Sequence, residues 1–145
     1  MGKKNRIKKP SGKNQGRQIP AQATPPLESS TDNENPSFRF TYTDKNRWLL
    51  SDWNSSEIND LIQVLKKIEK YTWAQIKTHG SKKRGSSVGT GYKLISSHPS
   101  LPENIPEDIK LSEMRIDEKK RIFGFRVDGV YYIVWFDRDH SVCPE

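Results

Sequence analysis

The sequence contains a single cysteine, Cys143, and this scarcity excludes a framework of internal disulfides. We therefore expect the protein to work in a reducing compartment. Long apolar runs are missing as well, since no stretch approaches the ~20 apolar residues that a membrane-spanning helix needs. The basic N-terminus is also not followed by the apolar segment of a secretory signal. These absences predict an intracellular, cytoplasmic protein with no membrane partner.

Large apolar side chains are scarce in residues 1–37, where only Ile7, Ile19 and Leu27 occur. The same stretch holds seven lysines and arginines against three acidic residues. Such a composition cannot bury enough surface to offset the entropy lost on ordering. We therefore predict a disordered basic tail over residues 1–37 and a single domain over residues 38–145. The tail is either a nucleic-acid-binding arm or a segment that only adds solubility.

Positive charge dominates the 145 residues as a whole, with a net charge of +7 and a pI near 9.5. A polyanionic partner is therefore more to be expected than for an average protein. The glycine- and serine-rich residues 80–91 form a second basic stretch, which contains Lys82, Lys83 and Arg84. Their spacing is not that of a phosphate-binding P-loop. This stretch is either a loop that follows a phosphate backbone or a solvated loop.

Two helices are predicted in the first half of the domain, after an alternating strand pattern over residues 37–43. Asn54 and Glu57 have the spacing of a capping box, and apolar residues then recur at helical spacing as far as Lys70. A shorter helix is expected to start after Thr72. Residues 92–95 have the composition of a short strand or a helix end.

The strongest hairpin signal is Asp128-Gly129, which lies between two stretches rich in β-branched and aromatic residues. It predicts antiparallel strands over residues 121–127 and 130–136, joined by a two-residue turn. A third strand is expected over residues 111–117. Because helices precede strands, the predicted fold class is α+β, with two N-terminal helices packed on a small antiparallel sheet.

The hairpin register assigns each side chain to one of two faces. One face is almost wholly apolar and is predicted to be core; its cross-strand pairs are Val127 with Val130, Phe125 with Tyr132, and Phe123 with Val134. The other face places Arg126 opposite Tyr131 and Ile122 opposite Trp135, beside the small residue Gly124. We predict that this second face is open and that a ligand binds to it.

The strand order and the motifs MRI, IFGFRV and YIVWF, which begin at Met114, Ile122 and Tyr132, resemble those of RelE/ParE-type toxins of type II toxin–antitoxin systems. The resemblance covers roughly residues 38–143. It implies a RelE-like fold and a metal-independent ribonuclease that cleaves mRNA, free or on the ribosome. It also implies a cognate antitoxin protein as a partner. The long stretch of residues 80–106 and the basic tail depart from the family pattern.

Members of this family that cleave RNA carry an arginine on the middle strand and a basic or aromatic residue near the end of the last strand. The matching positions here are Arg126 and His140, with Arg121 and Arg138 nearby. The arginines would stabilise the charge of the phosphorane, and His140 would act as the acid or base. The residues predicted to bind nucleic acid are Lys82, Lys83, Arg84, Arg115, Tyr131 and Trp135.

The same residues also allow alternative functions. ParE-like members of the fold act on gyrase, so the target can be a protein without any catalysis, and a non-catalytic RNA- or DNA-binding module is a further alternative. At the residue level, Arg126 can instead form an ion pair with Glu113 or Asp117. His140 can pair with the neighbouring acids, and the rings of Tyr131 and Trp135 can pack against the loop of residues 80–106.

No metal or small-molecule cofactor is predicted. Asp137, Asp139 and His140 make a poor metal site because adjacent residues on a strand point apart, and no glycine-rich nucleotide motif follows a strand. Joint action of Arg126 and His140 also requires a particular chain geometry. A fully extended chain from Tyr131, opposite Arg126, to His140 spans roughly 30 Å. The two side chains can therefore reach one phosphate only if the chain bends sharply after the last strand.

Overall fold

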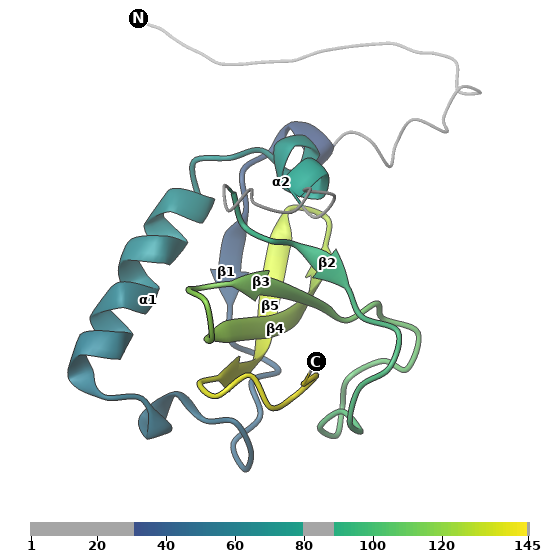
Figure 1. The fold of residues 1–145 in the computed structure, drawn as a ribbon. Coiled ribbons are helices and arrows are strands. Elements are labelled where there is room, and N and C mark those ends of the chain that lie inside the picture. Colours follow the sequence, from purple (N-terminus) through teal and green to yellow (C-terminus); the bar gives the residue numbers. More distant parts are fainter. Residues whose placement is uncertain (1–30, 80–88, 145) are drawn as a thin grey trace, which may run out of the picture. The chain divides into compact units, whose positions relative to one another are not determined.

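The computed structural model describes residues 31–79 and 89–144, which belong to one compact unit built on a five-stranded sheet (Figure 1). A short 3-10 helix at Leu50–Asp52 precedes the first α-helix. The α-helices and strands are, in chain order, β1 (Ser37–Arg39), α1 (Ser55–Ile68), α2 (Trp73–His79), β2 (Lys93–Leu94), β3 (Ser112–Arg115), β4 (Arg121–Val127) and β5 (Val130–Asp137).

The sheet is mixed, and its strand order is β1-β5-β4-β3-β2. β1 lies parallel to β5, with Ser37 opposite Val130, while the other neighbours are antiparallel. The predicted fold class, two N-terminal helices on a small antiparallel sheet in a RelE-like arrangement, is therefore wrong. A strand precedes both helices, and it pairs with the last strand of the chain. The alternation of residues in β1 indicates a strand but carries no information about its partner or direction.

Both helices begin with the caps that the sequence predicts. In α1 the Asn54 side chain accepts from the Glu57 backbone N–H, and the Glu57 carboxylate accepts from the Asn54 backbone N–H, each at 2.9 Å. Thr72 and Gln75 make the same reciprocal pair before α2. These bonds satisfy N–H groups that have no partner inside the helix. The capping predictions are confirmed, and α1 ends at Ile68.

The hairpin register is confirmed from the turn as far as Gly124, which lies opposite Ile133. Beyond that point a β-bulge shifts the pairing by one residue, so that Phe123 faces Trp135 instead of Val134. A Cβ atom on Gly124 would overlap the backbone carbonyl oxygen of Tyr132. The lack of a side chain at this position therefore permits the close approach of the two strands that the bulge requires.

The bulge changes which face of the sheet each aromatic ring occupies. Tyr131 packs on the helix side, with its ring centroid 6.1 Å from that of Trp73, whereas Trp135 packs on the other side, 5.0 Å from Trp48. Both side chains are fully buried. The prediction of an open, ligand-binding face that carries Tyr131 and Trp135 is therefore wrong.

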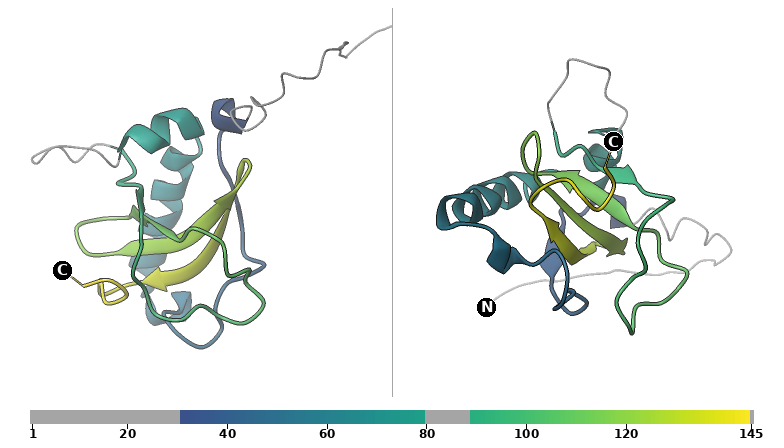
Figure 2. Two further views of the ribbon diagram at one scale, coloured as in Figure 1. Left: turned by 90° about the vertical axis from the view of Figure 1, so that its right-hand side faces the viewer. Right: turned by 60° about the horizontal axis from the view of Figure 1, so that its bottom comes forward.

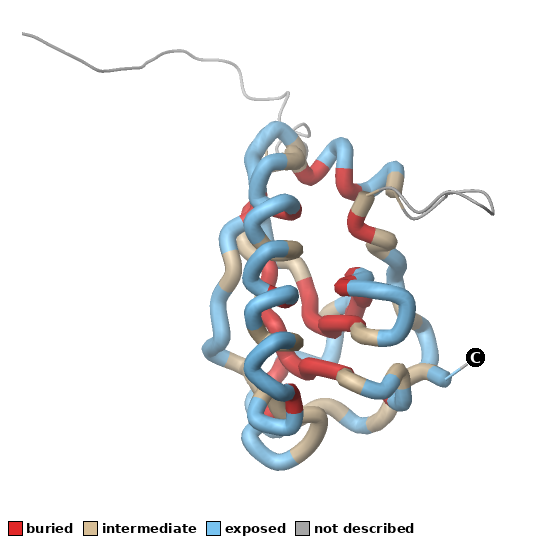
Figure 3. The backbone as a smooth tube through the Cα atoms, turned by 60° about the vertical axis from the view of Figure 1, so that its left-hand side comes forward, coloured by how far each residue is buried: buried red, intermediate tan, exposed pale blue. Residues whose placement is uncertain are grey.

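Each face of the sheet has its own hydrophobic core. The helices cover one face, and residues 95–111 with the C-terminal residues cover the other (Figure 2). Burial is concentrated in the strands, while α1 keeps an exposed outer side (Figure 3). Neither α1 nor α2 combines the length and the hydropathy that a helix crossing a membrane would need.

Residues 31–36 contact the domain, although their composition resembles that of the tail. The backbone carbonyl of Glu34 accepts a hydrogen bond from the backbone N–H of Trp73 at 3.0 Å. The Asn35 side chain donates to the carbonyl oxygen of Glu69 at 2.7 Å. These bonds fasten the segment to the start of α2 and the end of α1 immediately before β1 begins. The rest of the predicted tail, residues 1–30, lies outside the described residues.

Candidate nucleic-acid interface

The four residues predicted to act in catalysis lie at two separate places on the sheet. Arg126 is near the turn of the β4–β5 hairpin, opposite Tyr131. Arg121 is at the other end of β4, opposite Asp137, and the chain reaches Arg138 and His140 just after that point. The β5 residues between these positions span about 20 Å at the usual rise of a strand. Arg126 and His140 therefore do not reach a common phosphate.

Arg126 links the hairpin to residues 31–32 and to α2. Its Nη2 donates to Asp32 at 2.7 Å and to Thr31 at 2.9 Å, its Nε donates to the Asp128 carbonyl at 2.7 Å, and its guanidinium lies 4.5 Å from the Trp73 ring centroid. Hydrogen bonds to the Asp32 carboxylate hold the pKa of Asp32 below its usual range, and the bond from Lys77 has a larger effect than the bond from Arg126. The donors of Arg126 are thus directed at the protein itself.

Arg121 and Arg138 also have partners within the protein. Arg121 is buried, donates to the carbonyls of Asp117 and Lys120, and lies 3.7 Å from Glu113. Arg138 donates through Nε to Glu57 at 2.8 Å and joins the end of β5 to the start of α1. This hydrogen bond is the main cause of the lowered pKa of the Glu57 carboxyl. These two arginines connect parts of the fold.

His140 lies in the turn that follows β5, and its backbone φ is +59°. The buried Asp137 holds this turn, because its carboxylate accepts from the backbone N–H groups of Ser141 and Val142 at 2.9 Å each. The chain thus does bend after β5. The bend leaves His140 at the end of β5 far from Arg126, so the two side chains do not form one site.

Tyr131 and Trp135 do not form the predicted platform for bases, because both are fully buried. The Tyr131 hydroxyl donates to the Ser112 carbonyl at 3.1 Å, and burial raises its pKa above the usual range. The Trp135 indole donates to Asp44 at 2.8 Å. Three other predicted nucleic-acid-binding residues lie outside the described residues: Lys82, Lys83 and Arg84.

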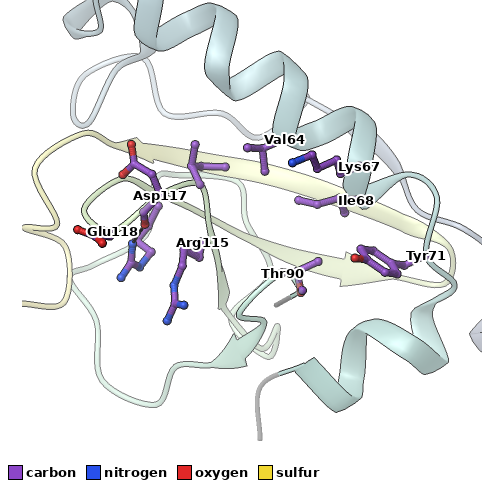
Figure 4. Close-up of a pocket in the computed structure, with 11 residues that line it drawn as sticks. Val64, Lys67, Ile68, Tyr71, Thr90, Arg115, Asp117 and Glu118 are labelled. Carbon is purple, nitrogen blue, oxygen red and sulfur yellow. Dashed lines mark hydrogen bonds between the residues drawn. The ribbon is translucent and has the colours of Figure 1, made fainter. Parts of the chain in front are cut away.

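Arg115 differs from the other arginines on the β3–β5 strands, because its side chain is exposed and lines a cleft of about 790 Å³. The cleft lies between the C-terminal half of α1 and the end of β3 (Figure 4). α1 contributes Val64, Lys67 and Ile68, and Tyr71 follows the helix at one end of the cleft.

A hydrogen-bonded frame forms the wall of this cleft opposite α1. The His79 Nδ1 accepts from the Thr90 backbone N–H at 3.0 Å, and the Thr90 carbonyl accepts from the Arg115 backbone N–H at 2.7 Å. The Tyr71 ring packs against His79 in a T-shaped contact, with centroids 4.6 Å apart. The wall therefore holds the backbone of Arg115 and the ring of Tyr71 in fixed positions.

The two exposed cations of the cleft, Lys67 and Arg115, form no ion pair with any carboxylate in residues 31–79 and 89–144. Seven other lysines and arginines in those residues do form ion pairs. Nearby, Asp117 is already bound by the Lys120 ammonium at 2.8 Å. Glu118 is exposed at the far end of the cleft. Lys67 and Arg115 are thus available for an anionic ligand.

The sequence identified Arg115 as a nucleic-acid-binding residue but did not indicate Lys67 or Tyr71. Lys67 resembles any solvated lysine on the outer side of an amphipathic helix. Tyr71 resembles an ordinary residue between two helices. Their meeting with β3 depends on how α1 packs on the sheet, and no local pattern reports this.

Comparison of the chain with protein-family models, with curated proteins and with solved structures found no match. The candidate site therefore rests on the geometry and charge of the chain itself.

Proposed function

We propose that the protein binds nucleic acid, and RNA in particular, at the cleft between α1 and β3. The observation that carries the proposal is the pair Lys67 and Arg115, which line one cleft and have no carboxylate partner among the described residues. Cations without such partners are the groups that can neutralise phosphates. Arginine is especially suited to this role because its planar fork can donate two hydrogen bonds to one phosphate.

The distribution of charge along the sequence supports a polyanionic ligand. Residues 31–79 and 89–144 carry 15 basic and 16 acidic residues, so this part of the chain is close to neutral. Residues 1–30 carry seven basic residues and one acidic residue, and residues 80–88 carry three basic residues. The basic segments are joined to the domain at Thr31, beside α2, and at His79 and Gly89, at the wall of the cleft. Long-range attraction by these segments would increase the rate at which RNA reaches the cleft.

RNA is favoured over duplex DNA because the site is concave. Unpaired RNA bases in loops and bulges can enter a concave site, whereas a duplex presents its convex backbone. A cytoplasmic location belongs to the same proposal. Cleavage of mRNA, action on the ribosome and binding of an antitoxin remain predictions from the resemblance. The four predicted catalytic residues do not converge on one site, so the proposal is limited to binding.

The test is a titration of a fluorescently labelled, single-stranded 20-nucleotide RNA at several salt concentrations. Each phosphate contact on a single strand contributes about 0.7 to the slope of log affinity against log salt. The double variant Lys67→Ala/Arg115→Ala should therefore reduce the magnitude of the slope by about 1.4. Arg39→Ala/Lys45→Ala is the matched control, because these exposed cations also form no ion pair within the described ranges and lie away from the cleft.

The control variant should keep the slope of the wild type. A protein that binds no RNA at low salt would overturn the proposal. The same conclusion would follow if the cleft variant and the control variant lost affinity and slope equally, because the two cations of the cleft would then have no special role.

A further inference from the structure

We infer that the cleft receives one unpaired nucleotide, with its base beside Tyr71 and its two flanking phosphates at Lys67 and at Arg115. This inference rests on the proposed RNA binding and adds the class of ligand that the site selects. The cleft would thus distinguish RNA with unpaired nucleotides from a continuous duplex.

The size of the cleft supports a single nucleotide. Its volume of about 790 Å³ lies within the range of roughly 300–1,000 Å³ that is typical of sites for small ligands. The bases of a duplex are stacked inside the helix, and a base must leave the stack before it can enter such a site. A nucleotide that is already unpaired does not incur this cost. The cleft should therefore prefer strands, loops and bulges.

The lining of the cleft matches the two halves of a nucleotide. Val64, Ile68 and Ile116 provide apolar surface. Tyr71 adds a half-buried aromatic ring, which its contact with His79 holds in position. Stacking of a base on an aromatic side chain is typically worth about 1–3 kcal/mol. The apolar and aromatic surface suits the base, while the cations suit the phosphate.

The arrangement of charges gives the nucleotide a direction. Lys67 lies on α1, and Arg115 lies on the opposite wall, where its side chain runs away from α1 (Figure 4). Tyr71 lies at one end of the cleft, and Asp117 and Glu118 lie at the other. The Asp117 carboxylate is compensated by Lys120, but Glu118 has no ion-pair partner in the described part of the chain. A further phosphate at that end would meet a like charge, which disfavours a backbone that runs along the whole cleft. The strand should therefore leave the cleft after one nucleotide.

The experiment compares three RNAs of equal length with the full-length wild-type protein: a single strand, a perfect duplex, and a duplex with one bulged 2-aminopurine. We expect the bulged duplex and the single strand to bind at least tenfold more tightly than the perfect duplex. We also expect the fluorescence of the bulged base to change on binding, because the base moves from solvent onto Tyr71. Glu118→Gln should strengthen binding of the single strand, since it removes a like charge near the phosphate.

Tyr71→Ala should reduce the preference for the bulged duplex to less than threefold, and Tyr71→Phe should restore it, since the ring is retained. Equal binding of the perfect and bulged duplexes by the wild type would overturn this inference while leaving RNA binding itself intact. Failure to bind any of the three RNAs would instead overturn the proposed function. Because the decisive comparison uses the wild type, it does not depend on whether Tyr71→Ala folds.

Discussion

Replacement of Arg126 by alanine should destabilise the fold, because this side chain joins three parts of the structure. The Arg126 side chain is 15% exposed. The substitution removes its charged hydrogen bond to Asp32, its hydrogen bonds to Thr31 and to the Asp128 carbonyl, and its contact with the Trp73 ring. A hydrogen bond to a charged group contributes about 1.5–3 kcal/mol, and a cation–π contact about 0.5–2 kcal/mol.

These contributions do not add fully, and two facts limit the total loss. Asp32 keeps its ion pair with Lys77 at 2.7 Å, so Arg126→Ala does not leave an uncompensated carboxylate. Asp32 is also 23% exposed, and water can replace part of what is lost. We therefore expect Arg126→Ala to lower the free energy of unfolding by about 2–3 kcal/mol, below the ~3–5 kcal/mol typical of breaking a fully buried pair. For a domain of this size the melting temperature should fall by roughly 8 °C.

The measurement is urea unfolding followed by tryptophan fluorescence, with Arg39→Ala as the control. Arg39 is exposed on β1 and forms no ion pair among the described residues, so its loss should change stability by less than about 0.5 kcal/mol. If Arg126→Ala kept the urea midpoint of the wild type and yet abolished RNA binding or cleavage, the structural role would be refuted and the predicted functional role would be favoured.

The effect of Arg126→Ala should also depend on pH. The folded-state pKa of Asp32 is lowered, so its ion pairs contribute stability above the unfolded-state pKa of about 3.9, and this contribution is lost as pH falls through the folded-state value. The difference in stability between wild type and Arg126→Ala should therefore be largest near neutral pH and should shrink below about pH 4. A remainder should persist, because the contact with Trp73 and the bond to the Asp128 carbonyl do not need an ionised carboxylate.

Two further predictions concern the bulge and the segment before β1. Gly124→Ala should lower the free energy of unfolding in urea by about 2–3 kcal/mol, because the added methyl group overlaps the Tyr132 carbonyl oxygen. An unchanged free energy of unfolding would show that the close approach does not hold the bulge. Removal of residues 1–36 should lower the melting temperature clearly more than removal of residues 1–30, since it deprives Arg126 of its carboxylate partner; equal melting temperatures would exclude a structural role for the six intervening residues.

Features that depend on neighbouring residues could be predicted well from the sequence. The two residues of the capping box, Asn54 and Glu57, are three positions apart, and both hydrogen bonds form as expected. The Asp128-Gly129 turn likewise determines the pairing of the strands next to it. In such cases the two partners are close in the chain, so the residue types and their spacing contain nearly all the information that the structure uses.

The predicted strand register is wrong beyond Gly124, because the close approach of the two backbones there shifts the pairing of every residue that follows. Strict alternation of side chains places Tyr131 and Trp135 on one face, but the bulge at Gly124 inserts an extra residue between them and turns Trp135 to the other side. A glycine in a strand is consistent with an open surface as well as with a bulge. Only the position of the Tyr132 carbonyl distinguishes the two cases.

The roles of the cations could not be predicted because a role depends on which carboxylate lies nearby in space. Glu113 and Asp117 are the partners that the sequence suggests for Arg126, but it pairs with Asp32, which is 94 residues away in the chain. Parallel pairing of β1 with β5 brings the two together, and no pattern in either strand indicates that pairing. The fold also provides acidic partners for Arg121 and Arg138, Glu113 on β3 and Glu57 on α1, and it leaves Arg115 without a carboxylate among the residues that the structure describes. A positively charged residue thus becomes a candidate for binding RNA when the fold provides it with no acidic partner, and this property belongs to the whole fold.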